Sequence, residues 1–142
     1  MEKLIAMLVP MLEGLGITLE VFIITLALSL PLGLMLALAR ISNCKPLSFI
    51  AETHIWLMRG TPLMLQLLFV YYALPSVGIK MSDMTAALLA FSLNYAAYFA
   101  EIFRSGIQSI ERGQYEAAKC LGFSYIQTMR RIIIPQMIKR VL

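Results

Sequence analysis

Four polar side chains recur along an otherwise apolar stretch, at spacings that bring them to one side of a helix. At about 100° per residue they fall within a sector of about 60°. They are Asn94, Tyr98, Glu101 and Ser105. Polar groups that face lipid are costly, so the stripe predicts either a lining for a polar solute or hydrogen bonds between helices. Gln66, in an earlier apolar stretch, is a further candidate for either role.

Other residue types that could do chemistry have simpler interpretations. Glu101 has a local partner, because Arg104 lies about one helical turn further along. His54 has no second ligand at helical spacing, which favours an interfacial residue over a metal ligand. Cys44 and Cys120 have neither paired spacing nor a nearby histidine, so we expect two free thiols. We therefore expect no metal site and no catalytic residue.

The elements that hold these residues belong in a membrane. The 142 residues are 60% hydrophobic and 14% charged, and the mean hydropathy is +0.80. Soluble domains are about 45–50% apolar and about 25% charged, and a chain this short buries too little surface to hide the excess. This composition excludes a soluble enzyme or a disordered chain and predicts an all-α integral membrane protein.

Three apolar segments are long enough to cross a bilayer core, which takes about 20 helical residues. The first is too long for a signal peptide, and its N-terminal flank is not basic. We expect a single transmembrane domain over 1–142, with crossings at 15–39, 47–75 and 83–103 and a loop at 104–135.

The second crossing contains a predicted break near 59–62. Its residues, Arg59-Gly60-Thr61-Pro62, favour a helix start with Thr61 as the N-cap and Pro62 in the first helical position. Ser82 or Asp83 is expected to cap the third crossing. Each crossing is therefore defined by its apolar run and by its capping residues.

The basic residues predict the orientation, because cytoplasmic loops are enriched in lysine and arginine. With the N-terminus outside, only Lys3 and Lys80 lie outside. Eight basic residues then lie inside: Arg40, Lys45, Arg59, Arg104, Arg112, Lys119, Arg130 and Arg131. This asymmetry predicts three crossings and a cytoplasmic 104–135 segment. In a soluble protein the net charge of +4 could suggest nucleic acid, but here its distribution along the chain is more informative than its sum. We expect the lipid bilayer and no nucleic acid as a partner.

The 104–135 segment predicts two short helices around a turn. Gln114–Leu121 is a good helix-forming run, and Gly122 fits the left-handed position just after a helix. Ser124 and Gln127 form a capping box for the next helix, which Pro135 breaks or kinks. From the residues alone, this segment is either a loop that packs on its own bundle or a surface for another protein.

The same segment resembles the signature loop of bacterial ABC importer permeases: Glu-Ala-Ala, three residues, Gly, nine residues, Ile-x-Leu-Pro. Ile134 replaces the Leu. The residues that carry this resemblance are Gly113, Glu116, Ala117, Ala118, Gly122, Ile132 and Pro135. Other motifs resemble the polar amino acid (histidine/glutamine/arginine) branch: Arg59-Gly60-Thr61-Pro62-Leu63 with Gln66, Asn94 to Glu101, Phe103 to Ile107, and Gly113 to Glu116.

The resemblance implies a partial type I ABC importer-like helix bundle. Its signature loop would be a coupling helix that binds in a groove of a cytoplasmic ATPase subunit. ATP would then be bound and hydrolysed by that subunit, and this chain would be neither an enzyme nor a cofactor protein. The implied partners are a second permease copy or a paralogue, and an extracytoplasmic amino-acid-binding protein. The implied location is the bacterial inner membrane, and Gln66, Asn94, Tyr98 and Glu101 are candidates for the substrate path.

Two alternatives remain open at this point. The same loop serves permeases for other solutes, such as opines or peptides. Members of the family continue with further crossings after the signature proline, whereas this sequence ends seven residues beyond Pro135. We therefore expect a C-terminally truncated chain, and a membrane remnant without transport activity is the second alternative.

Overall fold

The computed structural model describes the backbone of residues 2–141 and the side chains of residues 8–141. Lys3, which contributes to the predicted orientation, lies outside the described side chains. Within the described part every regular element is a helix. The helices are α1 (Glu2–Arg40), α2 (Lys45–Gly60), α3 (Leu63–Leu68), α4 (Leu74–Ser76), α5 (Asp83–Gln108), α6 (Arg112–Cys120), α7 (Tyr125–Thr128) and α8 (Ile134–Val141), with π-helical turns η1 (Phe69–Ala73) and η2 (Met129–Ile133).

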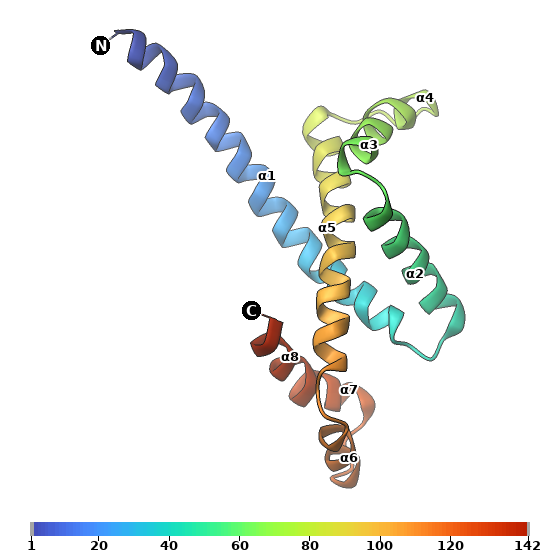
Figure 1. Ribbon diagram of the computed structural model, residues 1–142. Coiled ribbons are helices and arrows are strands. Elements are labelled where there is room, and N and C mark those ends of the chain that lie inside the picture. Colours follow the sequence, from blue (N-terminus) through green and yellow to red (C-terminus); the bar gives the residue numbers. More distant parts are fainter. Residues whose placement is uncertain (1, 142) are drawn as a thin grey trace.

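Helices α1 and α5 run in the same direction and cross (Figure 1). The segment from α2 to α4, which connects them in sequence, runs in the opposite direction. In the described part, α1 from Leu8 to Arg40 and α5 are each long and apolar enough to cross a membrane. The segment from α2 to α4 is a third span if its two bent halves count as one, with a bend of 106° between them. The all-α fold predicted from the composition is confirmed.

The crossing of α1 and α5 depends on small residues. A Cβ atom on Gly33 would lie 2.6 Å from the Cβ atom of Phe99 and 3.1 Å from the carbonyl oxygen of Ala96. Ala37 on α1 and Ala100 on α5 are fully buried beside this point. Small side chains let two membrane helices approach closely, which strengthens their van der Waals contact.

The helix boundaries differ from the expected segments in several places. Helix α1 begins at Glu2, well before the expected residue 15, and α2 begins at Lys45, two residues before the expected start. The chain remains in α5 until Gln108, so the expected loop at 104–135 begins with five residues that belong to the helix. The expected start at Gln114 is also wrong, because α6 begins at Arg112 and ends at Cys120. Ser82 caps α5 as predicted, since its side chain accepts a hydrogen bond from the backbone N–H of Thr85.

The prediction that Thr61 caps a new helix is wrong. The Thr61 hydroxyl donates back to the carbonyl oxygen of Leu57, at 2.8 Å, and so belongs to the end of α2. The next helix starts at Leu63, with Pro62 at its N-cap. A backward bond of this kind competes with capping because a threonine hydroxyl readily reaches the carbonyl four residues earlier.

Two later prolines lie just after π-helical turns. Pro75 follows η1 and Pro135 follows η2, each two residues beyond the end of the turn. A proline lacks the N–H that would bond four residues back and its ring crowds that carbonyl. The wider turn accommodates the ring, so Pro135 adjusts its helix without ending it.

Candidate functional site

The break between α2 and α3 leaves a backbone acceptor without a helical partner. In an unbroken helix the carbonyl of Met58 would accept from residue 62, but Pro62 has no N–H. Two side chains replace that donor. Asn94 Nδ2 donates to the Met58 carbonyl from α5, at 3.0 Å, and Gln66 Nε2 donates to it from α3, at 2.9 Å. The break is therefore joined to α5 by a side-chain hydrogen bond.

Gln66 and Asn94 also bond to each other, so the structure brings two of the four candidate path residues together. Asn94 Nδ2 donates to Gln66 Oε1 at 2.9 Å, and Gln66 Nε2 contacts the Thr61 hydroxyl at 2.7 Å. Asn94 is 4% exposed. Both hydrogens of its amide nitrogen have acceptors in this network, which suits the interpretation of a bridge between helices.

Tyr98 and Glu101 face the same break through Arg59, the last side chain before Gly60. The guanidinium carbon of Arg59 lies 5.6 Å from the centre of the Tyr98 ring, and its Nη1 lies 3.6 Å from Glu101 Oε2. The first contact is a cation–π interaction. Sequence reasoning placed Arg59 in a motif but missed its role, because the contact depends on how α2 lies against α5.

The predicted pair between Glu101 and Arg104 is confirmed. Arg104 Nε and Nη2 donate to the two carboxylate oxygens at 2.9 and 2.8 Å, a bidentate arrangement. Ser105, in contrast, donates to the carbonyl of Ile102 in its own helix and contributes nothing across helices. The polar stripe on α5 therefore contacts α2 and α3 through its first three members only.

A cavity of about 480 Å³ lies beside Gln66, between the end of α2, η1 and α5. Its lining is almost wholly apolar and includes Leu65, Phe69 and Leu93. In the described part of the chain no group of three His, Cys, Asp or Glu side chains could hold a metal ion. In this structure the polar side chains at the break therefore form hydrogen bonds mainly with one another and with the backbone at the break.

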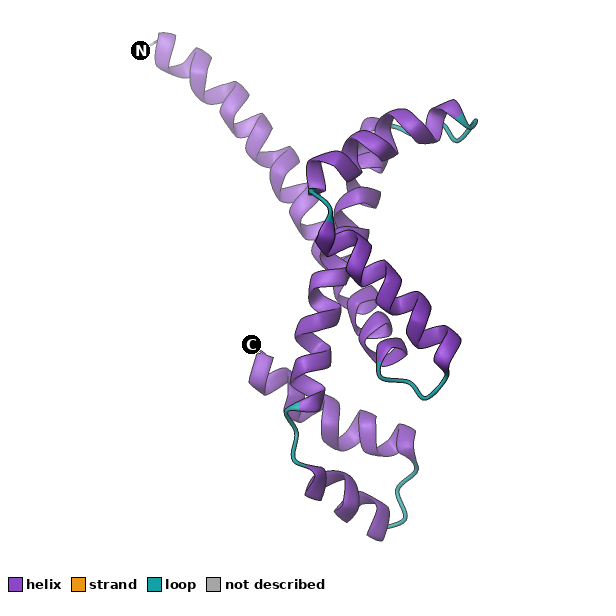
Figure 2. Cartoon of the chain, turned by 45° about the vertical axis from the view of Figure 1, so that its right-hand side comes forward, coloured by secondary structure: helices purple, strands orange, loops and turns teal. Residues whose placement is uncertain are grey.

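We call the segment from α6 to α8, Arg112–Val141, the signature hairpin; Figure 2 shows its two arms and the turn between them. Gly122 has φ +77°, the left-handed conformation that the sequence predicts. The N–H of Phe123 donates to Ala118 and that of Gly122 to Lys119, which together form a Schellman motif. The predicted capping box is also present, with the Ser124 and Gln127 side chains each bonded to the other's backbone.

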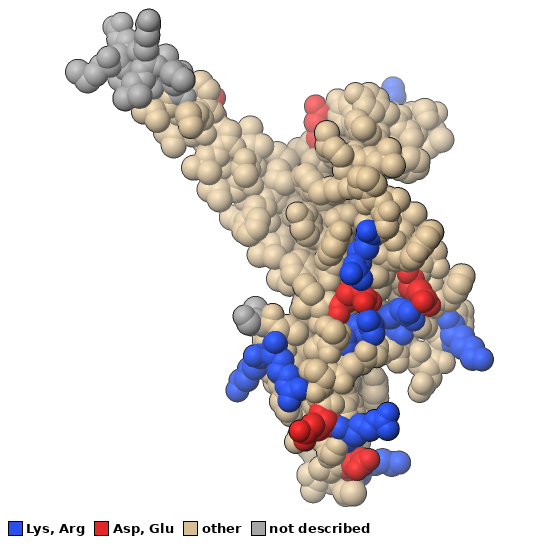
Figure 3. All heavy atoms as spheres, in the orientation of Figure 1, with Lys and Arg blue, Asp and Glu red and all other residues tan. Residues whose placement is uncertain are grey.

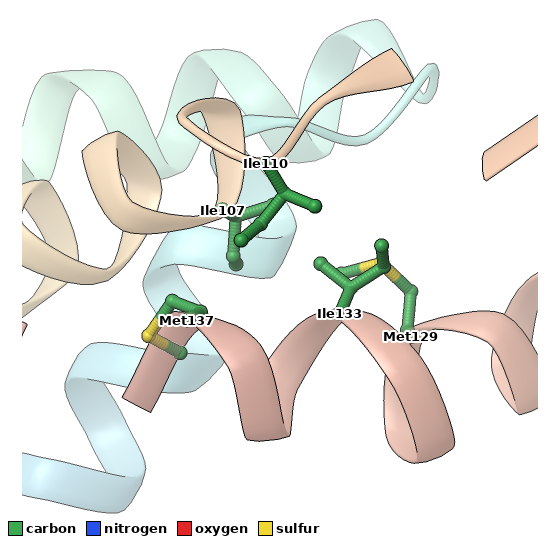
Figure 4. Close-up of a cluster of buried hydrophobic side chains, with 5 residues drawn as sticks. All are labelled: Ile107, Ile110, Met129, Ile133 and Met137. Carbon is green, nitrogen blue, oxygen red and sulfur yellow. The ribbon is translucent and has the colours of Figure 1, made fainter. Parts of the chain in front are cut away.

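The signature hairpin is anchored to the end of α5 by a compact apolar core. Figure 4 shows Ile107 and Ile110 facing Met129, Ile133 and Met137. All five side chains are at least nine-tenths buried. The Tyr115 hydroxyl donates to the Ile107 carbonyl at 3.4 Å, and burial raises the pKa of this phenol.

A glycine and an arginine add two further contacts to this anchor. A Cβ atom on Gly106 would lie 2.6 Å from Val141 Cγ1 and 2.8 Å from Met137 Cγ, so α8 packs directly on the α5 backbone. The Arg140 guanidinium donates to the carbonyl and the hydroxyl of Ser109, which ends α5. A cation at a helix C-terminus satisfies its free carbonyls and suits its dipole.

The turn of the signature hairpin presents apolar side chains outward. Leu121, Tyr125 and Ile126 are 74%, 63% and 75% exposed. Of the two alanines in the signature, Ala118 is buried and Ala117 is exposed. The other signature residues divide in the same way: Gly113, Glu116, Gly122 and Pro135 are exposed, and Ile132 is half-buried. On the face shown in Figure 3, most lysines and arginines lie over the half of the molecule that carries the hairpin.

These features define a multi-pass helical membrane protein with a helical hairpin attached to the end of one crossing helix. A family model described as "Binding-protein-dependent transport system inner membrane component" matches residues 29–142. The chain belongs to this family. The resemblance to ABC importer permeases noted in the sequence is thereby confirmed.

The similar proteins are amino-acid transporter permeases. The chain is 47% identical over 127 residues to the "Probable amino-acid ABC transporter permease protein YckA" of Bacillus subtilis (strain 168), covering 89% of this chain and 56% of that protein. It is 44% identical over 131 residues to the "Arginine transport system permease protein ArtQ" of the same strain, covering 92% and 60%. The chain thus spans little more than half the length of these relatives.

A solved structure gives the same result for the fold. The "Crystal structure of an amino acid ABC transporter with histidines" matches with a TM-score of 0.78 and 36% sequence identity. The match covers 94% of this chain and 65% of that one. The arrangement of α1 to α8 is therefore that of part of an ABC transporter permease.

Proposed function

We propose that this chain is the membrane permease subunit of an ATP-driven importer for polar amino acids. The signature hairpin would dock into a cytoplasmic ATPase subunit, which binds and hydrolyses the ATP. The chain itself would catalyse no reaction and would bind no cofactor. Support comes from the family match and from the names of relatives that transport arginine, glutamine or cystine.

The observation that carries the proposal is the exposed apolar turn on a firmly anchored hairpin. Leu121, Tyr125 and Ile126 expose their side chains at the end of the molecule where the basic residues gather. Exposed apolar groups at a water-facing end mark contact surfaces for other proteins. Because the hairpin packs on α5 through a buried core, a partner bound at the turn could move that helix.

The orientation and the remaining partners follow from the same proposal. The hairpin lies in the cytoplasm and the N-terminus lies outside a bacterial inner membrane, which fits the asymmetry of the basic residues. A second permease, either a copy or a paralogue, completes the transporter, and an extracytoplasmic binding protein delivers the amino acid. Among the path candidates, Tyr98 and Glu101 are partly exposed, whereas Gln66 and Asn94 are bonded to each other.

The test compares two glycines with the same local structure at opposite ends of the molecule. Gly122 and Gly78 both have positive φ, both close a Schellman motif, and neither has atoms within 4 Å of an added Cβ. A side chain at either position costs about 1 kcal/mol of backbone strain. Gly122→Asp should abolish co-purification of the ATPase, whereas Gly78→Asp should retain it.

A second variant separates binding from folding. Ile126 is 75% exposed, so Ile126→Glu changes the turn surface without disturbing the buried core. We expect the permease with this change to insert normally and to lose its ATPase. Equal recovery of the ATPase with Ile126→Glu, Gly122→Asp and the unaltered permease would refute a docking role for the hairpin.

A further inference from the structure

One helix, α5, contacts both the signature hairpin and the break between α2 and α3. At its C-terminal end, Gly106 lies against Met137 and Val141, and Ser109 accepts hydrogen bonds from Arg140. These contacts involve backbone atoms and a close-packed core, and such cores do not deform continuously. The hairpin and the end of α5 should therefore move as one body.

Further along the same helix, Asn94 holds an acceptor that no backbone donor can reach. The Met58 carbonyl is left free by Pro62, and Asn94 binds it across a gap of 36 residues in sequence. The second hydrogen of the same amide binds Gln66, on the far side of the break. One side chain on α5 thus contacts both halves of the bent segment.

The geometry of the break makes this contact consequential. The halves of the segment meet at 106° and are joined only by Thr61 and Pro62, so few backbone bonds fix their relative direction. Gly60, at the end of α2, has no atoms within 4 Å of an added Cβ. The direction of α3 relative to α2 therefore depends on side-chain bonds at the break. Gln66 binds the Met58 carbonyl and Thr61 from within the segment, and Asn94 adds two bonds from α5, to the Met58 carbonyl and to Gln66 itself.

We propose that Asn94 is a positioning residue that sets the bend between α2 and α3. Through it, a movement of the signature hairpin is carried along α5 to the bent segment. The transmission of movement rests on the proposed function, since it requires an ATPase to drive the hairpin. The control of the bend by Asn94 does not rest on the proposed function, because the bend can be measured without an ATPase.

The bend is measured with spin labels on its two halves. Ile50 on α2 and Val77 after α4 are 65% and 71% exposed and suit labelling after cysteine substitution. The native Cys44 and Cys120 are free and exposed, so both are first replaced by serine. Distances between the labels are then recorded by pulsed electron paramagnetic resonance, with the chain in lipid nanodiscs.

Asn94→Leu keeps the volume of the side chain and removes both donors. We expect the population of less bent conformers to rise about tenfold, as loss of a buried hydrogen bond implies. The matched control is Ser92→Ala, on the same helix: Ser92 is 4% exposed, its hydroxyl has no partner, and its removal should change nothing. If Asn94→Leu does not fold, Asn94→Ala removes both donors without adding a charge or a longer side chain.

The second measurement uses the permease assembled with its ATPase in vesicles. We expect Asn94→Leu to raise the ATP hydrolysed per amino acid imported, because hairpin movement no longer reaches the bend. A side chain that only stabilises the bundle would reduce the amount of complex and leave that ratio unchanged. A side chain that only lines the path would raise KM at an unchanged ratio.

The two measurements distinguish failure of the proposed function from failure of the inference about Asn94. If the chain binds no ATPase, the proposed function is refuted and the distances still report on Asn94. If Asn94→Leu, or Asn94→Ala where the leucine variant does not fold, gives the same distance distribution as Ser92→Ala and the unaltered chain, control of the bend is refuted. An altered bend with an unchanged ratio would refute the transmission of movement through α5.

Discussion

The crossing of α1 and α5 can be tested by adding one carbon atom. In Gly33→Ala, the new Cβ would lie 2.6 Å from the Cβ atom of Phe99, 3.1 Å from the Ala96 carbonyl oxygen and 3.2 Å from the Ala100 nitrogen. Two of these three neighbours are backbone atoms, which no rotation of a side chain can remove. The two helices must therefore separate where they now touch.

The expected magnitude follows from two opposing effects. Alanine favours a helix over glycine by about 1 kcal/mol. Overpacking a close contact costs about 1–3 kcal/mol, and a backbone contact on a rigid helix belongs near the upper end of that range. Gly33→Ala should therefore lower the free energy of unfolding by about 2 kcal/mol.

Two other glycines provide matched controls. Gly16, in the same helix, has nothing within 4 Å of an added Cβ, so Gly16→Ala should raise the free energy of unfolding by about 1 kcal/mol at most. The nearest neighbours of Gly106 are the side-chain atoms Val141 Cγ1 and Met137 Cγ. Met137 is 1% exposed within the buried core, so these side chains can shift only slightly, and Gly106→Ala should lower the free energy of unfolding by about 1 kcal/mol, less than Gly33→Ala.

Unfolding is followed in mixed micelles of increasing SDS content. A donor dye on Met11→Cys and an acceptor on Val77→Cys, both at exposed positions, report the loss of the fold by energy transfer. We expect the midpoints to fall in the order Gly16→Ala, Gly106→Ala, Gly33→Ala. If Gly33→Ala is as stable as Gly16→Ala, the close crossing of α1 and α5 is refuted.

Three further predictions concern topology, charge and capping. Cys44 and Cys120, both exposed, should react with a membrane-impermeant thiol reagent only from the cytoplasmic side; labelling in sealed cells would contradict the orientation. Glu101→Gln should lower the free energy of unfolding by about 1 kcal/mol, because it weakens the pair with Arg104. Uptake of lysine relative to glutamine into vesicles should stay the same if Glu101 serves only this pair, and a selective loss of lysine uptake would show that Glu101 lines the path. Ser124→Ala should cost about 1 kcal/mol, seen as faster hydrogen exchange in α7.

The signature hairpin could be predicted almost completely from the sequence because its signals are local. Gly122 requires the left-handed conformation within one turn of the helix it ends, and the Ser124–Gln127 capping box spans four residues. Such features depend on neighbours in sequence and hardly on the rest of the fold. The limits of α6 were less accurate, because Arg112 and Gly113 extend a helix that the composition alone does not favour.

The break between α2 and α3 was predicted in position and not in detail. Pro62 ends the helix wherever the chain goes, so its effect is visible in the sequence. The Thr61 hydroxyl could either accept from a backbone N–H of the following helix or donate to a carbonyl of the preceding one, and in the folded chain it donates to Leu57. The partner of the Met58 carbonyl lies on α5, and no local pattern identifies Asn94 as that partner.

The contacts at the break also explain why the polar stripe of α5 lies where it does. A broken backbone and a charged side chain are each costly within a bilayer unless protein or water satisfies them. Here they satisfy one another: Asn94 binds the carbonyl that Pro62 frees, and Arg59 faces both Tyr98 and Glu101. A stripe on an unbroken helix would require separate partners, so the break and the stripe depend on each other in this fold.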